Sequence, residues 1–269
     1  MSQDSLPIEA DLSTSSQPLA SPQDAANTST AKSAATSQTT ATAVHPEATA
    51  SAEKAANLRQ EDPLMIVAYF AISLYLVKIW WDDFKRNDSG DPQPNGFPGA
   101  TRCKPLAVWI AVIGALLLLG LETAGEYALG ISAEQSDITR IFLLSMIAAA
   151  FIEELIFRGF LVCENRGKAA LVGSIVGFSL LFALLHPHLW HLRFDEGIPA
   201  WQIWSGEFSL DFSLKAFFTT GILFVNSLWF YVARFNRWNP SHSLIPCFVA
   251  HLVKNVGVFI IKWAQGHVV

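Results

Sequence analysis

Six blocks of apolar residues, each about as long as a membrane-crossing helix, dominate the chain after residue 60. About 20 apolar residues span the hydrocarbon core of a bilayer, whereas a soluble protein interleaves apolar positions with polar surface positions. Charged residues make up only 15% of the chain, against roughly 25% in soluble domains. We therefore predict an all-α fold, a multi-spanning transmembrane bundle of about six helices in a lipid bilayer. The blocks cover about residues 64–81, 106–121, 138–162, 169–187, 216–233 and 244–263.

The first 62 residues have a different composition from the rest. Ser, Thr, Ala, Gln and Pro dominate residues 1–62, and this segment has no aromatic residue. Such a segment cannot bury enough apolar surface to offset its ordering entropy, so we expect a disordered low-complexity tail. We assign residues 63–137 to two accessory spans with their loops, and residues 138–265 to a functional core. The role of the long 188–215 segment stays open.

Charge and cysteine content narrow the class of protein. The net charge is −5, and no basic stripe of the kind that binds nucleic acid occurs. Three scattered cysteines without a CxxC pair argue against a disulfide framework or a thiolate metal site. Basic residues divide almost evenly between the two sets of loops, so the orientation in the membrane stays open. We expect a multi-pass protein of the bacterial inner membrane.

Three ionisable residues stand inside the third apolar block. Glu153, Glu154 and Arg158 occur in the run MIAAAFIEELIFRGFLV, and each charge at the bilayer centre costs about 2.5–3.5 kcal/mol on insertion scales. Glu154 and Arg158 are four residues apart and share a helix face, which favours an ion pair between them. Glu153 lies about 100° around the helix from Glu154, so we expect it to face a partner outside that ion pair. The alternative is one structural ion network of all three.

A histidine ends the fourth block at a depth that suits Glu153. Phe182 and His186 are four residues apart in FALLH and share one helix face. If blocks three and four form an antiparallel hairpin, residues 153 and 186 are symmetric about residues 169–170, which lie in the stretch ENRGKAALVG. Glu153 and His186 can then face each other. The alternative is a packing or interfacial histidine.

The sixth block carries a second polar face. His251 and Asn255 are again four residues apart, in HLVKN, so both face the same side of one helix. Hydrogen bonding between helices is the simplest alternative use for them. Lys254 points elsewhere and is expected to extend to an interface. Glu122 and Glu126, at the end of the second block, are expected to be loop-side charges.

These three sites together resemble a known protease family. EELIFR resembles the EExxxR motif of the CAAX protease and bacteriocin-processing (CPBP, or Abi) family of intramembrane proteases, FALLH its FxxxH motif and HLVKN its HxxxN motif. The order of the motifs also agrees, and the resemblance covers about residues 140–262. The long 188–215 insertion between the second and third motifs is a departure, and it leaves the substrate-access surface undefined.

The resemblance implies an intramembrane endopeptidase whose site is open to the membrane plane. By that resemblance Glu153 and His186 activate a water, His251 and Asn255 stabilise the oxyanion, and Glu154 and Arg158 orient Glu153. In a metallo-type alternative, Glu153, His186 and His251 hold a divalent metal such as zinc. The residues do not decide between the glutamate and metallo types, and no cofactor is certain.

The substrate class stays broad. Membrane-associated proteins or peptides are the expected partners, including prenylated CAAX proteins and bacteriocin-type leader peptides. Buried Glu and His also serve proton-coupled transporters, although the blocks lack the paired broken helices of transporter repeats. A third hypothesis is a catalytically silent family member that acts as an immunity or scaffold protein.

Overall fold

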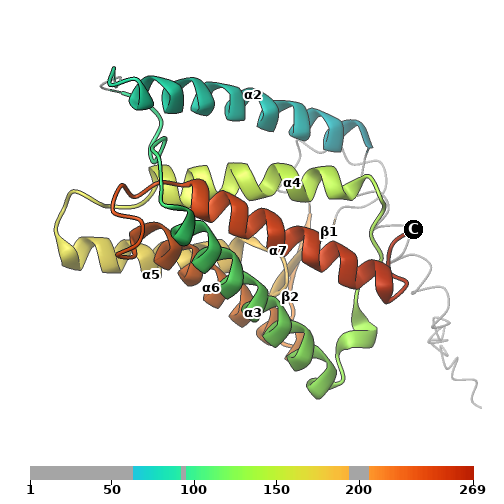
Figure 1. Cartoon of the computed structure of the whole chain (residues 1–269). Coiled ribbons are helices and arrows are strands. Elements are labelled where there is room, and N and C mark those ends of the chain that lie inside the picture. The colour runs from blue at the N-terminus through green and yellow to red at the C-terminus, as the bar shows by residue number, and fades with distance from the viewer. Residues whose placement is uncertain (1–62, 92–94, 194–205) are drawn as a thin grey trace, which may run out of the picture. The chain divides into compact units, whose positions relative to one another are not determined.

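The computed structural model describes residues 63–91, 95–193 and 206–269, all within one compact unit. The predicted disordered tail and part of the 188–215 insertion lie outside the described residues. Five helices of the described part are long and apolar enough to cross a membrane, which confirms the multi-spanning helical fold (Figure 1). These helices are α2 (Pro63–Asp88), α3 (Pro105–Leu129), α5 (Lys168–Leu185), α6 (Leu214–Phe235) and α7 (Ile245–Ala264).

The third predicted block is a composite helix. It begins as the α-helix α4 (Phe142–Glu153) and continues directly as a π-helical segment, η2 (Glu154–Phe160). The widened turn is closed by a hydrogen bond from the Leu161 amide to the Ile156 carbonyl, 2.9 Å long and five residues back. Single π turns inside helices often occur at functional sites, and this one begins at the Glu153–Glu154 pair. The sequence predicted a helix here but not its change of form.

Helix packing places α4 and α7 in the middle of the described bundle. α4 contacts both α2 and α7, α7 also packs along α3, and α6 contacts α3, α5 and α7 (Figure 1). A buried apolar cluster joins α2, α3, α6 and α7, and Trp80 packs edge-on against Phe151 and Phe248 within it. Aromatic pairs of this geometry add to the stabilisation from area burial alone. The core therefore fixes α4 against α7, the two helices that carry three of the six candidate residues.

Short non-helical elements occupy the connections. A 3-10 turn, η1 (Ser132–Glu134), follows α3, and Ile138 forms a bridge with Val268 near the chain end. The insertion between the second and third motifs contains an antiparallel pair of strands, β1 (Trp190–Arg193) and β2 (Glu207–Leu210), which the sequence did not predict. Trp190 faces Leu210 across this pair.

Helix α3 approaches α6 most closely at a glycine. A Cβ added at Gly114 would overlap the indole ring of Trp229, whose Nε1 donates to the Ala111 carbonyl at 2.9 Å. Gly120, two turns further along α3, has open space around it. A methyl group therefore fits at Gly120 but not at Gly114, although both residues lie on α3.

Gly114→Ala should lower the stability of the bundle, because the added methyl group forces Trp229 out of its position. Overpacking of this kind costs about 1–3 kcal/mol. Thermal unfolding of the detergent-solubilised protein measures the effect. Gly120→Ala is the matched control, and it should leave the midpoint unchanged or raise it, since Ala favours helix over Gly. Equal midpoints for the two variants would contradict the close approach.

Candidate active site

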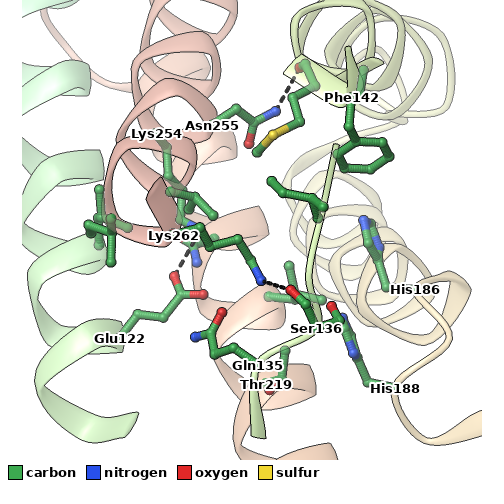
Figure 2. Close-up of a pocket in the computed structure, with 18 of the residues that line it drawn as sticks. Glu122, Gln135, Ser136, Phe142, His186, His188, Thr219, Lys254, Asn255 and Lys262 are labelled. Carbon is green, nitrogen blue, oxygen red and sulfur yellow. Dashed lines mark hydrogen bonds and ion pairs between the residues drawn. The ribbon is translucent and has the colours of Figure 1, made fainter. Parts of the chain in front are cut away.

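Four of the predicted residues line a single cavity of about 650 Å³. Glu153 ends α4, His186 directly follows α5, and His251 and Asn255 lie one turn apart on α7. Figure 2 shows His186 and Asn255 on facing walls of this cavity. Glu153 and His186, which the sequence argument expected to face each other, thus both line this cavity. The roles of all six predicted residues stay predictions.

Behind the cavity wall, Glu154 and Arg158 form a fully buried ion pair. Both side chains have 0% exposure, and the Arg158 Nη1 donates to Glu154 Oε1 at 3.1 Å. The Arg158 Nη2 donates to the carbonyl and the hydroxyl of Ser227 on α6, at 3.0 and 2.6 Å. The guanidinium also lies 4.7 Å from the ring centroid of Phe182 and 5.0 Å from that of Tyr231. The pair thus has several of the partners that a buried charge needs, while Glu154 Oε2 and Arg158 Nε have no hydrogen-bond partner among the described residues.

His251 connects this ion pair to the cavity. Its Nδ1 lies 2.8 Å from Glu154 Oε1, and since a carboxylate only accepts, Nδ1 carries the proton. The other ring nitrogen, Nε2, lies 3.9 Å from Glu153 Oε2. Phe230 stacks on the imidazole with a centroid distance of 4.8 Å. Glu154 therefore fixes the ring so that Nε2 points toward Glu153.

His186 is held in the same manner by its own helix. The Nδ1 donates to the Phe182 carbonyl at 2.8 Å, because a carbonyl oxygen only accepts. In the neutral ring, Nε2 is then the acceptor. The Phe182 ring lies 4.8 Å from the imidazole centroid, so the motif spacing FxxxH supplies both a hydrogen bond and a packing surface. His186, which lines the cavity, thus has a lone pair on Nε2 that can accept a hydrogen bond.

Asn255 keeps one donor available. Its Nδ2 donates to the Met146 carbonyl on α4 at 2.8 Å (Figure 2). An amide NH₂ group has two hydrogens, and this bond uses one. The contact orients the amide against α4, and within residues 63–91, 95–193 and 206–269 its second hydrogen has no further acceptor.

The donor geometry does not suit a metal ion. Glu153, His186 and His251 were the proposed ligands, yet within residues 63–91, 95–193 and 206–269 no three His, Cys, Asp or Glu side chains converge closely enough to hold one. Zinc requires ligand atoms at about 2.0–2.2 Å for nitrogen and oxygen. The metallo alternative therefore stays a prediction without support from this arrangement.

A buried ion pair also lines the cavity. Lys254 and Glu122 form an ion pair at 2.9 Å between α7 and α3, with side chains only 7% and 16% exposed (Figure 2). Both expectations from the sequence were wrong, because Lys254 does not extend to an interface and Glu122 is not a loop-side charge. The cavity is lined by Lys254 as well as by its neighbour Asn255 on α7. The pairing depends on α3 packing along α7, which helix periodicity cannot reveal.

Sequence reasoning also missed Asn226 and Tyr69, which line the cavity from α6 and α2. Asn226 is 2% exposed, and its Nδ2 donates to the Ile222 carbonyl at 3.0 Å. Its Oδ1 has no hydrogen-bond partner among the described residues. The available signal was a lone amide inside the fifth apolar block. Tyr69 gave no such signal, because an aromatic residue is ordinary in a spanning helix.

The fold and the site together define a class: a polytopic helical membrane protein with a Glu/His cavity inside its bundle. A family model described as type II CAAX prenyl endopeptidase, Rce1-like, matches residues 135–257. The match contains all three motifs and confirms the predicted resemblance to the CPBP family. Residues 135–257 are thus similar to this family, which supports a CAAX protease-like hydrolase and implies membrane-associated protein substrates and a lipid bilayer. No curated protein and no solved structure matches the chain.

The buried ion pair should be essential for stability. Arg158→Met leaves Glu154 as an uncompensated buried charge, and breaking a buried pair from one side costs about 3–5 kcal/mol. Lys78→Met is the matched control, since Lys78 forms the same i, i+4 pair with Asp82 but with side chains 71% and 43% exposed. An exposed pair contributes about 0–1 kcal/mol. In detergent, the thermal unfolding midpoint of Arg158→Met should be clearly lower than that of Lys78→Met. Similar midpoints would contradict the claim that the buried pair stabilises the bundle.

Proposed function

We propose that the protein is an intramembrane endopeptidase that hydrolyses a peptide bond of membrane-associated, CAAX-type substrates with a water activated by Glu153 and His186. The observation that carries the proposal is the convergence of Glu153, His186 and His251 on one cavity, with His251 held by a buried ion pair. The Rce1-like match over the same residues supports this activity class. A bacterial inner membrane as the location remains part of the proposal.

In the proposed reaction, Glu153 is the general base. The carboxylate takes a proton from a water in the cavity while the water oxygen attacks the carbonyl carbon of the scissile bond. His186 Nε2 accepts the second hydrogen bond of this water and orients it. Glu153 then gives the proton to the leaving nitrogen as the C–N bond breaks, which yields a carboxylic acid and an amine, and the acid then passes its proton to the amine. A positioned base of this kind contributes typically 10²–10⁴-fold.

His251 and Asn255 are the proposed oxyanion donors. The second hydrogen of the Asn255 amide is available, and the protonated form of His251 donates from Nε2 while Glu154 retains Nδ1–H. The buried Glu154 carboxylate stabilises that positive ring. Loss of one such donor typically costs about 10²–10³ in rate. Glu154 and Arg158 act through His251 and are positioning residues in this scheme.

The other two function classes are less favoured. A proton-coupled transporter would also use buried Glu and His residues, but the Rce1-like match does not favour it. A catalytically silent scaffold would not need the available Asn255 hydrogen or the Nε2 lone pair of His186. Both alternatives predict that no peptide is cut.

Glu153→Gln should abolish cleavage, because an amide cannot accept the proton of the water at neutral pH. We expect a loss of at least about 10²-fold in kcat with an unchanged thermal midpoint. The assay follows cleavage of a prenylated CAAX peptide by the purified protein in nanodiscs. Glu207→Gln, an exposed position on β2, is the matched control and should retain full activity. Full activity of the Glu153 variant would end the proposal.

The glutamate and metallo types differ in their response to chelation. Because the three candidate ligands do not converge as a metal site requires, we expect the cleavage rate to survive dialysis against a strong chelator. Elemental analysis of the dialysed protein provides the independent readout. Loss of activity that zinc restores would establish the metallo type and overturn this expectation.

A further inference from the structure

The β1–β2 hairpin has two chemically different faces. Side chains alternate between the two faces of a strand, and the register of the pair assigns each residue to one of them. The apolar face consists of Trp190, Leu192, Phe208 and Leu210. The other face carries Glu207 and the opposed residues His191 and Ser209. The hairpin is therefore amphipathic, and the proposed hydrolysis assigns it no task.

The chain itself covers little of the apolar face on β2. Phe208 and Leu210 are 60% and 57% exposed. The indole of Trp190 lies beside the Phe208 ring at a centroid distance of 6.3 Å, so the exposed side chains are neighbours. A contiguous exposed apolar patch marks a site of interaction with a membrane or another molecule. The face is therefore available to an apolar partner outside the chain.

The position of the hairpin indicates which partner this is. α5 ends at Leu185 shortly before β1 begins, and α6 begins at Leu214 shortly after β2 ends. The two helices pack against each other and are both long enough to cross a membrane, so their connection lies at one surface of the bilayer. Leu185 and Leu214 are themselves exposed. Apolar surface that faces lipid thus borders the hairpin on both sides along the chain.

Hydrogen bonds attach the hairpin to the end of α5. The Trp190 indole Nε1 donates to the Leu184 carbonyl at 2.7 Å. The antiparallel pairing continues beyond the strands, where the Asp211 amide donates to the Leu189 carbonyl at 2.9 Å. His186 directly follows α5 and lies in sequence between these two attachment points. The placement of the hairpin and the placement of His186 are therefore coupled.

We propose that the β1–β2 hairpin binds the lipid interface, with its apolar face in the boundary between headgroups and acyl chains and its polar face in water, and that it thereby holds His186 at a fixed depth. Tryptophan is enriched at this boundary, which suits Trp190. Amphipathic helices bind in the plane of the interface through a buried apolar face, and the hairpin offers the same two-sided chemistry. The inference does not depend on the proposed peptidase activity.

A spin-label scan of β2 tests the orientation of the hairpin, with the full chain in nanodiscs. Cys103→Ala and Cys163→Ala remove the two partly exposed thiols, whereas Cys247 is fully buried and stays. Labels are then attached singly to the variants Glu207→Cys, Phe208→Cys, Ser209→Cys and Leu210→Cys. Labels at Phe208 and Leu210 should collide more with oxygen, which dissolves among acyl chains. Labels at the other two positions should collide more with a water-soluble nickel chelate.

The expected preference thus reverses at every residue, because successive side chains of a strand point to opposite faces. The same preference at all four positions overturns the inference. Little collision with either reagent at Phe208 and Leu210 also overturns it, because protein and not lipid would then cover the apolar face.

Hydrogen exchange in nanodiscs tests whether lipid holds the segment that contains His186. Leu210→Asn makes the apolar face more polar, and Ser209→Asn is the matched control on the other face. The first variant should exchange the amides of residues 186–193 severalfold faster than the wild type, while the control should keep the wild-type rate. Leu210→Met keeps the face apolar and should also keep that rate. Unchanged exchange in Leu210→Asn overturns the holding role, and the spin-label scan decides the orientation if this variant fails to fold.

Discussion

The buried contact among Arg158, Glu154 and His251 is the interaction on which the rest of the site depends. Arg158 on η2 binds Glu154 on the same helix and Ser227 on α6, while Glu154 binds His251 on α7. The fully buried Glu154–Arg158 pair thus joins η2 to α6 and α7. Each partner satisfies a charge or donor that would be costly to bury alone, so removal of any of them leaves an unpaired group inside the bundle. The network stabilises the packing and also fixes the tautomer of the histidine that faces Glu153.

Helix periodicity made this part of the site predictable from sequence. Glu154 and Arg158 are four residues apart, as are His251 and Asn255, and residues with this spacing share a face. The division of labour between Glu154, which is buried, and Glu153, which lines the cavity, follows from the 100° between neighbours on a helix. His186 was added to the predicted site residues because it would lie at the same depth as Glu153 in a helical hairpin. These inferences need only local geometry and the cost of charge in an apolar segment.

Tertiary packing decided what the sequence could not reveal. From the sequence, Glu122 is predicted to be a charge at a helix end. Only the packing of α3 along α7 brings its Oε2 to 2.9 Å from Lys254 Nζ. The π-helical form of η2 likewise has no signature in composition, because it shifts hydrogen bonds by one residue within an apolar run. The strands β1 and β2 lie in the 188–215 segment, whose role the sequence left open. In each case the missing information is the position of a partner distant in sequence.

The cavity concentrates polar groups in a bundle whose outer surface is apolar, as Leu117 and Trp109 illustrate with 70% and 65% exposure. Polar side chains within such a bundle are stable only with partners, and Asn226 has a buried polar atom that lacks one. Asn226 donates its amide nitrogen to the Ile222 carbonyl, and its buried Oδ1 has no protein donor among the described residues. A buried acceptor left unpaired costs about 1–3 kcal/mol. A water or a peptide N–H that reached this oxygen would remove that cost.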